Sequence, residues 1–126
     1  MILLTAEEIL LLHQKLLLAT GGREGLRDRG LLESAVHAMN AGFDNVERYP
    51  TAEEKAARLA FSLICNHAFV DGNKRVGILA MLMRLALNDK PLTYTQAELI
   101  ELGLSIASGA AETDAIHAWI MAHRSR

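Results

Sequence analysis

The sequence predicts an all-α fold of about six helices packed around a central apolar helix. Hydrophobic residues make up 51% of the 126 residues, and they recur at the spacing of one helix face. Hydroxyl residues followed three positions later by glutamate also recur, which is the pattern of a capping box at a helix start. The length and the apolar content suit one core, so we expect a single domain over residues 1–126.

Polar connections separate the first three predicted helices. Thr5 opens the first helix, and the Gly21–Gly22 pair ends it, because glycine readily adopts the left-handed cap conformation. The second helix buries a face that includes Leu32, and Thr51 opens the third, which delivers His67 at its C-terminal end. We expect these helices at about residues 6–19, 29–41 and 52–66, with loops at residues 21–28 and 42–50.

The fourth predicted helix contains a single charged residue, Arg84, so it is apolar nearly all round and we expect it to be central. Gly77 within it allows a neighbouring helix to pack closely. A turn with Pro91 follows, and Thr95 opens the next helix with a capping box. We expect the last three helices at about residues 76–87, 96–108 and 114–124.

Charge and cysteine content exclude several classes of protein. Thirteen basic and fifteen acidic side chains leave a net charge of −2, which argues against a protein that coats nucleic acid or an anionic membrane. The apolar runs are shorter than a membrane span. The single cysteine, Cys65, cannot form an internal disulfide, so we expect a reducing cytoplasm and a small buried hydrophobe at this position.

The most informative segment spans residues 67–75, His-Ala-Phe-Val-Asp-Gly-Asn-Lys-Arg, directly before the fourth helix. Lys74 and Arg75 fall where the positive end of the helix dipole lies, and each such placement costs roughly 0.3–1 kcal/mol. Exceptions of this kind are concentrated at functional sites. The segment therefore predicts a bound anion, and the phosphates of a nucleotide suit it best.

The predicted phosphate site consists of Gly72, Asn73, Lys74 and Arg75. Gly72 lets the backbone turn sharply, so that amides near Asn73 converge on an oxyanion at the start of the helix. Lys74 supplies a point charge, whereas Arg75 supplies a planar fork for bidentate contacts.

Asp71 and His67 complete the predicted chemistry. Magnesium is bound through one or two carboxylates and phosphate oxygens, so Asp71 is a candidate Mg²⁺ ligand. An unperturbed imidazole titrates near neutrality, which makes His67 a candidate general base. Phe69 lies between them, and a buried ring there would fix the two groups relative to each other. The remaining histidines are interpreted as solvated or hydrogen-bonded surface residues without metal-ligand spacing: His13, His37, His117 and His123.

A purely structural interpretation of the segment stays open. In that interpretation Asp71 or Asn73 caps the helix, His67 satisfies a helix end, and Lys74 and Arg75 are solvated.

The pattern His-x-Phe-x-Asp-Gly-Asn-Lys-Arg resembles the signature of the Fic superfamily, and its lysine variant is similar to the Doc, or death-on-curing, branch. The likeness extends over nearly the whole chain. Further Doc-like segments lie at residues 5–9, 21–28, 30–35 and 53–57.

The resemblance implies an all-helical Fic/Doc fold with ATP and Mg²⁺, in which His67 is the base, Asp71 binds the metal and the following residues hold the phosphates. The sequence departs twice from nucleotide-transferring Fic enzymes. Lys74 replaces a glycine, and Ile78 stands where a further arginine would be.

The Doc branch implies transfer of the γ-phosphoryl group of ATP to a threonine of elongation factor Tu, by a cytoplasmic toxin that halts translation. The alternatives are a Fic-type adenylyltransferase and a non-catalytic antitoxin-binding module. The loop that carries Arg23, Arg27 and Arg29 is a candidate for guiding an acidic partner, with a merely solvated loop as the alternative.

Inhibition is expected from an antitoxin. Residues 20–25 match the letters of the internal inhibitory helix of some Fic proteins, but their glycines predict a loop. The resemblance implies a disordered antitoxin segment that folds as a helix in an apolar groove of this domain.

Overall fold

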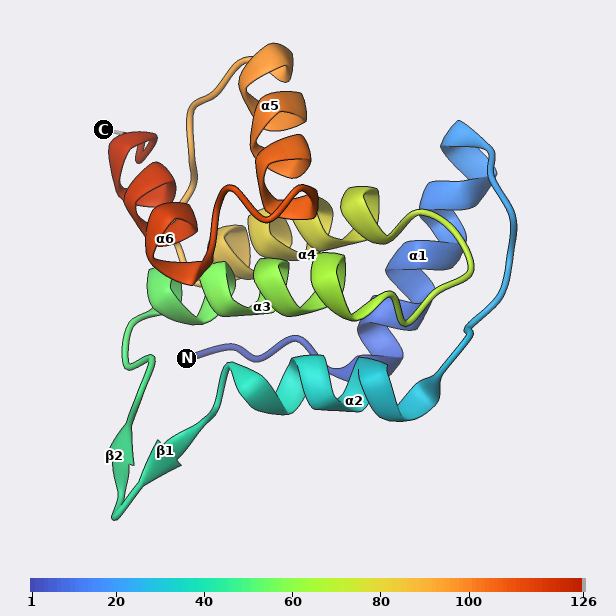
Figure 1. The fold of residues 1–126 in the computed structure, drawn as a ribbon. Coiled ribbons are helices and arrows are strands. Elements are labelled where there is room, and N and C mark those ends of the chain that lie inside the picture. Colours follow the sequence, from blue (N-terminus) through green and yellow to red (C-terminus); the bar gives the residue numbers. More distant parts are fainter. Residues whose placement is uncertain (126) are drawn as a thin grey trace.

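A computed structural model describes residues 1–125 and confirms the all-α prediction, with six helices and one short hairpin in that range (Figure 1). The helices are α1 Ala6–Thr20, α2 Arg29–Ala38, α3 Ala52–Asn66, α4 Asn73–Leu87, α5 Gln96–Ala107 and α6 Thr113–Ala122; the strands are β1 Gly42–Phe43 and β2 Val46–Glu47.

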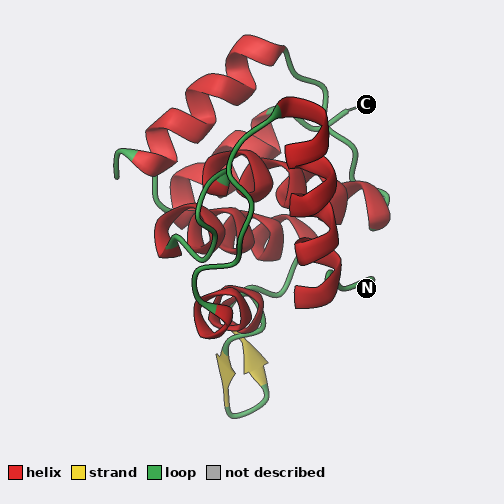
Figure 2. Cartoon of the chain, turned by 90° about the vertical axis from the view of Figure 1, so that its right-hand side faces the viewer, coloured by secondary structure: helices red, strands yellow, loops and turns green. Residues whose placement is uncertain are grey.

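The centre of the fold is a pair of helices rather than one apolar helix. α3 packs against α2, α4, α5 and α6, whereas α4 packs against α1, α3 and α5. The prediction that Gly77 allows close helix packing is confirmed, since a Cβ there would lie 2.5 Å from the Ile64 Cγ1. The closeness of α3 and α4 places the loop that joins them at one end of the molecule, where it meets the loop between α1 and α2 (Figures 1 and 2).

Four helix starts have a side-chain cap. Thr5, Thr51 and Thr95 accept hydrogen bonds from the third helical amide of α1, α3 and α5, and Asp28 caps α2. α4 and α6 begin without such a cap. Because a start without a side-chain cap leaves more backbone donors without an internal acceptor, the start of α4 can offer its amides to an external anion.

Several element bounds differ from the prediction. α2 ends at Ala38 rather than near residue 41, because the chain turns there into the hairpin of β1 and β2. Asp44 and Asn45 form the hairpin tip with φ of 51° and 63°, the left-handed region that these two residues tolerate. α4 begins at Asn73 rather than 76, since Gly72 at φ 80° provides its N-cap.

Cys65 is exposed, so the prediction of a small buried hydrophobe was wrong. Successive helical residues are about 100° apart, and Cys65 directly follows the buried Ile64 away from the core face. Within residues 1–125, no helix combines the length and the apolar character that a membrane crossing requires.

A histidine joins the last two helices. The His123 ring stacks on Trp119 at 3.9 Å between centroids, its Nδ1 lies 2.7 Å from the Trp119 carbonyl, and its Nε2 lies 2.6 Å from the Glu98 Oε2. Both partners are acceptors, so the doubly protonated ring satisfies both contacts. The Trp119 carbonyl, followed by the Glu98 carboxylate, raises the pKa of His123, and the bond from His123 lowers the pKa of Glu98.

We expect His123 to stabilise the fold more at about pH 6 than at about pH 9. A pKa raised by folding gives stabilisation that is complete below the unfolded value, about 6.5, and is lost as the pH rises through the folded value. The measurement is urea unfolding of the parent and of His123→Phe, which keeps an aromatic ring but cannot donate. The difference in unfolding free energy between the parent and His123→Phe should be smaller at the higher pH. An equal difference at the two pH values would contradict the stabilising role of the protonated His123 ring.

Candidate active site

The loop of residues 67–72, which joins α3 to α4, is held by backbone pairing with the loop of residues 21–28. The two loops run antiparallel around a bridge between Leu26 and Phe69. The Ala68 carbonyl accepts from the Arg27 and Asp28 amides (2.7 and 3.0 Å), and the Gly25 carbonyl accepts from the Val70 amide (3.0 Å). The polar loop of the sequence prediction is therefore one wall of the site.

His67 lies at the C-cap of α3 with φ 53° and ψ 48°, the left-handed conformation. Its carbonyl accepts from the Arg27 Nε at 2.8 Å, while the Arg27 Nη2 reaches the Asn66 carbonyl at 3.3 Å. Arg27 thus caps the end of α3 and fixes the backbone of His67. The His67 side chain remains exposed, as a general base that must reach a substrate hydroxyl requires.

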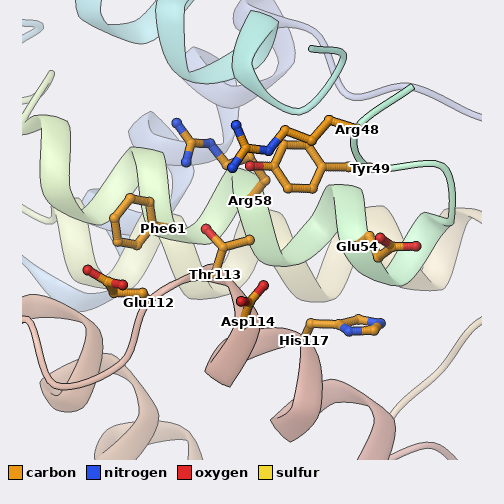
Figure 3. A pocket seen from close by; sticks show the side chains of 9 residues that line it. All are labelled: Arg48, Tyr49, Glu54, Arg58, Phe61, Glu112, Thr113, Asp114 and His117. Atoms are coloured by element: carbon orange, nitrogen blue, oxygen red, sulfur yellow. The ribbon is translucent and has the colours of Figure 1, made fainter. Parts of the chain in front are cut away.

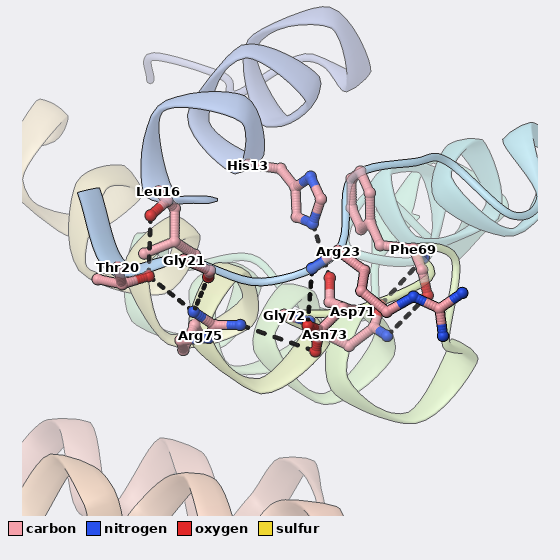
Figure 4. A network of polar contacts seen from close by, with 10 residues as sticks. All are labelled: His13, Leu16, Thr20, Gly21, Arg23, Phe69, Asp71, Gly72, Asn73 and Arg75. Atoms are coloured by element: carbon pink, nitrogen blue, oxygen red, sulfur yellow. Dashed lines mark hydrogen bonds and ion pairs between the residues drawn. The ribbon is translucent and has the colours of Figure 1, made fainter. Parts of the chain in front are cut away.

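The side chain of Asn73 holds the loop rather than a ligand. Its Oδ1 accepts from the Phe69 amide at 3.1 Å and its Nδ2 donates to the Phe69 carbonyl at 3.0 Å (Figure 4). Phe69 is buried, as expected, with 2% of its surface exposed. Any contact of Asn73 with a phosphate would therefore come from its backbone amide at the start of α4.

His13 is a positioning residue that the sequence analysis assigned wrongly to the surface. It is 4% exposed and stacks on Phe69 with ring centroids 3.8 Å apart. Its Nε2 lies 2.7 Å from the Asp71 carbonyl, which can only accept, so Nε2 bears the proton. The sequence did contain a signal, because His13 lies four residues from both Ile9 and Leu17 on the buried face of α1.

Asp71 is held as a carboxylate by backbone donors. Its Oδ2 accepts from the Arg23 amide at 3.0 Å and its Oδ1 from the Gly72 amide at 2.8 Å, and the Arg75 Nη2 lies 3.7 Å from the Oδ1 (Figure 4). These two amides, and then Arg75, lower the pKa of Asp71.

The donor set suits magnesium that arrives with phosphates. Residues 1–125 contain no group of three or more His, Cys, Asp or Glu arranged to hold a metal. A single half-exposed carboxylate such as Asp71 is what Mg²⁺ uses when waters and phosphate oxygens complete its octahedron. The residues therefore fit a nucleotide-bound ion and do not form a closed metal cage.

The start of α4 has the features that the predicted phosphate site requires. Gly72 has φ 80° and no side chain with which to cap the helix, and Lys74 beside it is exposed. A Cβ at Gly72 would lie 3.4 Å from the His13 Nε2 and from the Arg75 Nη2, an ordinary van der Waals contact, so glycine is favoured there by the positive φ rather than by lack of space. The amides and Lys74 together provide donors and positive charge for an oxyanion.

Arg75 is anchored to the end of α1. Its Nη1 donates to the Thr20 Oγ1 at 2.7 Å and to the Gly21 carbonyl at 2.9 Å (Figure 4). A Cβ at Gly22 would lie 3.0 Å from the Arg75 Nη2 and 2.9 Å from the Asp71 Oδ2, which shows how closely this loop covers both charged groups. Lys74 is consequently the more accessible of the two predicted cations.

A model of the Fic/DOC family matches residues 3–85, which include the loop of residues 67–72 and the start of α4. The chain belongs to the Fic/Doc family. It is also similar to Toxin Doc of Mycolicibacterium smegmatis (strain ATCC 700084 / mc(2)155), with 50% identity over 58 residues. That match covers 46% of this chain and 45% of the relative, so it spans less than half of either protein. The identity supports the Doc branch of the family.

The Fic/Doc chain brings all of its predicted site residues to one end of the α3–α4 pair. Three of them offer accessible chemistry: the exposed His67 imidazole, the half-exposed Asp71 carboxylate and the exposed Lys74 ammonium. Of the others, Gly72 and Asn73 shape the loop of residues 67–72, and Arg75 is hydrogen-bonded to the Gly21 carbonyl at the end of α1. Arg27 donates to the His67 carbonyl, and Arg29 forms ion pairs with Glu7 and Glu33. Of the three arginines in this loop, Arg23 is therefore the candidate for guiding an acidic partner.

We expect His13→Ala to lower the free energy of unfolding by about 2–4 kcal/mol, because it removes a buried ring and the partner of the Asp71 carbonyl. His13→Gln keeps a donor and should restore part of the loss. Urea unfolding measures both. His37→Ala, at an exposed position of α2, is the matched control and should stay within about 0.5 kcal/mol of the parent. Equal losses of unfolding free energy in His13→Ala and His37→Ala would show that His13 does not position the loop.

Proposed function

We propose that this chain is the toxin of a bacterial toxin–antitoxin pair and transfers the γ-phosphoryl group of ATP to a Ser or Thr hydroxyl of a translation factor. One arrangement supports the proposal. The exposed His67 lies on a loop that is held by backbone hydrogen bonds, and that loop leads directly into the start of α4, which has no side-chain cap and bears the exposed Lys74. The similarity to a protein named Toxin Doc supports the toxin role. The partners proposed for this chain, a translation factor and an antitoxin, act in the cytoplasm, so the cytoplasm is its proposed site of action.

His67 takes the proton of the target hydroxyl. The hydroxyl oxygen then forms a bond to the γ-phosphorus, the bond between that phosphorus and the β–γ bridging oxygen breaks, and ADP leaves. Such a transfer asks the protein mainly for positioning and charge neutralisation. Lys74 and the first amides of α4 supply positive charge at the transferring group, and Arg75 steadies the loop that faces it. Mg²⁺ held by Asp71 would neutralise charge on the phosphate oxygens.

Two residues favour γ-phosphoryl over adenylyl transfer. Ile78 is 9% exposed and supplies no cation one turn into α4, at the position where the resemblance puts an arginine in adenylyl-transferring relatives. Lys74 supplies its charge at the start of the helix instead. A nucleotide is therefore expected to place its terminal phosphate, rather than its α-phosphate, next to His67.

The proposed target is elongation factor Tu, on the strength of the resemblance to the Doc branch. Arg23 lies at the mouth of the site, where its amide holds Asp71. An arginine at this place would meet an acidic surface of the target and speed encounter more than it would tighten binding.

We also propose an antitoxin groove between α1, α4 and α5. Its walls are largely apolar, and Ile100 and Leu104 on α5 are 57% and 53% exposed. Lys74 and Arg75 close one end, so a helix lying in the groove would reach the phosphate site. An amphipathic helix with an acidic residue at that end fits both features. The apolar lining comprises Leu16, Ile78, Leu79, Leu82, Leu99, Ile100 and Leu104.

Incubation with elongation factor Tu and ATP labelled at the α or the γ phosphate tests the activity. We expect label on the target only from the γ position, and a loss of at least a hundredfold in His67→Ala, since a general base contributes about 10²–10⁴-fold. His37→Ala serves as the control and should label the target like the parent.

Each other outcome assigns a different function. Label from the α position alone would establish adenylyl transfer. Absence of label from both, together with growth arrest that persists in His67→Ala, would leave a non-catalytic antitoxin-binding module.

The groove is tested by binding of the cognate antitoxin. Leu104→Glu places a charge on the apolar wall and should weaken binding by at least tenfold, about 1.4 kcal/mol, as measured by calorimetry. Leu18→Glu is the control, because Leu18 is 81% exposed on α1 and does not line the groove. Equal affinities of the two variants would exclude this groove as the antitoxin site.

A further inference from the structure

Thr20, the last residue of α1, contacts Arg75 in the first turn of α4 across 55 positions of the chain. Its Oγ1 donates to the Leu16 carbonyl at 2.8 Å and accepts from the Arg75 Nη1 at 2.7 Å (Figure 4). A hydroxyl has one proton and two lone pairs, so the bond to Leu16 fixes the proton and leaves a lone pair for the guanidinium. The helix that carries Thr20 therefore orients it as an acceptor for Arg75.

The contacts that anchor Arg75 use a single nitrogen of its guanidinium. The Nη1 donates to the Thr20 hydroxyl and to the Gly21 carbonyl, whereas the Nε and Nη2 donate no hydrogen bond within residues 1–125. The buried nitrogens that lack a partner in this range belong to other arginines, so the Nε and Nη2 of Arg75 both reach solvent. The Nε–Nη2 edge is a two-donor fork of the kind that binds phosphate oxygens in a planar, bidentate contact.

The groups that hold Arg75 are neutral, so its positive charge stays available. A hydroxyl and a carbonyl satisfy two donors without cancelling the charge, whereas a carboxylate at hydrogen-bond distance would cancel much of it. The Asp71 Oδ1 lies 3.7 Å from the Arg75 Nη2, beyond hydrogen-bond distance, and it accepts from the Gly72 amide. Thr20, Lys74 and Arg75 line the same groove, so an anion that enters there can meet both cations.

We propose that Thr20 is a positioning residue of the phosphate site. It holds the Arg75 Nη1 at the end of α1 and thereby leaves the Nε–Nη2 edge to bind a phosphate group of the nucleotide. This inference rests on the proposed function and adds to it a residue outside the segment of residues 67–75.

The contact itself is tested without nucleotide, by NMR of protein with ¹⁵N-labelled arginine. An Nη1 that is held by two acceptors rotates slowly, so we expect separate Nη1 and Nη2 resonances for Arg75, assigned by their loss in Arg75→Lys. Thr20→Val has the same shape but no hydroxyl, and it should raise the rate at which the two resonances exchange. Thr20→Ser should keep the slow exchange of the parent. An unchanged exchange rate in Thr20→Val would overturn the inference.

The consequence for binding is measured by calorimetry with Mg²⁺ and adenylyl-imidodiphosphate, an ATP analogue that resists transfer of its terminal phosphate. Thr20→Val should weaken binding by about tenfold, because a charge-assisted contact loses its orientation. Thr20→Ser should bind within about twofold of the parent. Circular dichroism establishes that each variant is folded, and Thr20→Ala, which also lacks the hydroxyl and has a higher helix propensity, is the second variant.

Thr113→Val is the matched control and should bind like the parent. Thr113 lies at the start of α6 and lines a separate cavity, to which neither Thr20 nor Arg75 contributes (Figure 3).

A double mutant separates positioning of Arg75 from a general effect on the loop. Arg75→Lys keeps the charge but loses the fork, so adding Thr20→Val to it should weaken binding by less than about twofold further. Additive losses, or parent-like binding by folded Thr20→Val and Thr20→Ala, would overturn the inference and leave the proposed function intact. A parent that does not bind the analogue with Mg²⁺ would overturn the proposed function and, with it, this role of Thr20.

Discussion

The pairing of the loop at residues 21–28 with the loop at residues 67–72 is the constraint on which the candidate active site depends. A histidine in the left-handed conformation and a helix start without a cap are both unfavourable in isolation. Backbone bonds to Ala68 and Val70, together with the Arg27 contacts, hold that geometry in place. The groups that fix the loop are buried or bonded, whereas the groups proposed to react are exposed.

In the segment of residues 67–75, some residues hold the loop in place and others supply its positive charge. The first turn of α4 collects positive charge that no internal carboxylate neutralises fully, since Asp71 meets Arg75 only at 3.7 Å and is itself bound by two amides. Arg75 is instead retained by the end of α1. Residual positive potential at an uncapped N-terminus is the physical basis for expecting phosphate there.

The parts of the fold that could be predicted depend on local signals. The capped helices α1, α3 and α5 begin where Thr5, Thr51 and Thr95 place them, because a cap and its partner lie within one turn. The candidate site residues all lie within residues 67–75, so a motif identifies them. The contact between the His13 ring and the Asp71 carbonyl spans 58 positions, and the bridge between Leu26 and Phe69 also forms only when distant loops meet. No local pattern reports such contacts.

The tight fit at Gly77 links the interior of the α3–α4 pair to the candidate site. Ile64 lies three residues before the proposed base, and Gly77 lies two residues after Arg75, so their contact sets the distance between the ends of α3 and α4. A larger residue at position 77 would have to displace the Ile64 side chain or shift one helix against the other. The spacing of the candidate site is thus exposed to substitutions in the interior that leave every residue of the 67–75 segment unchanged.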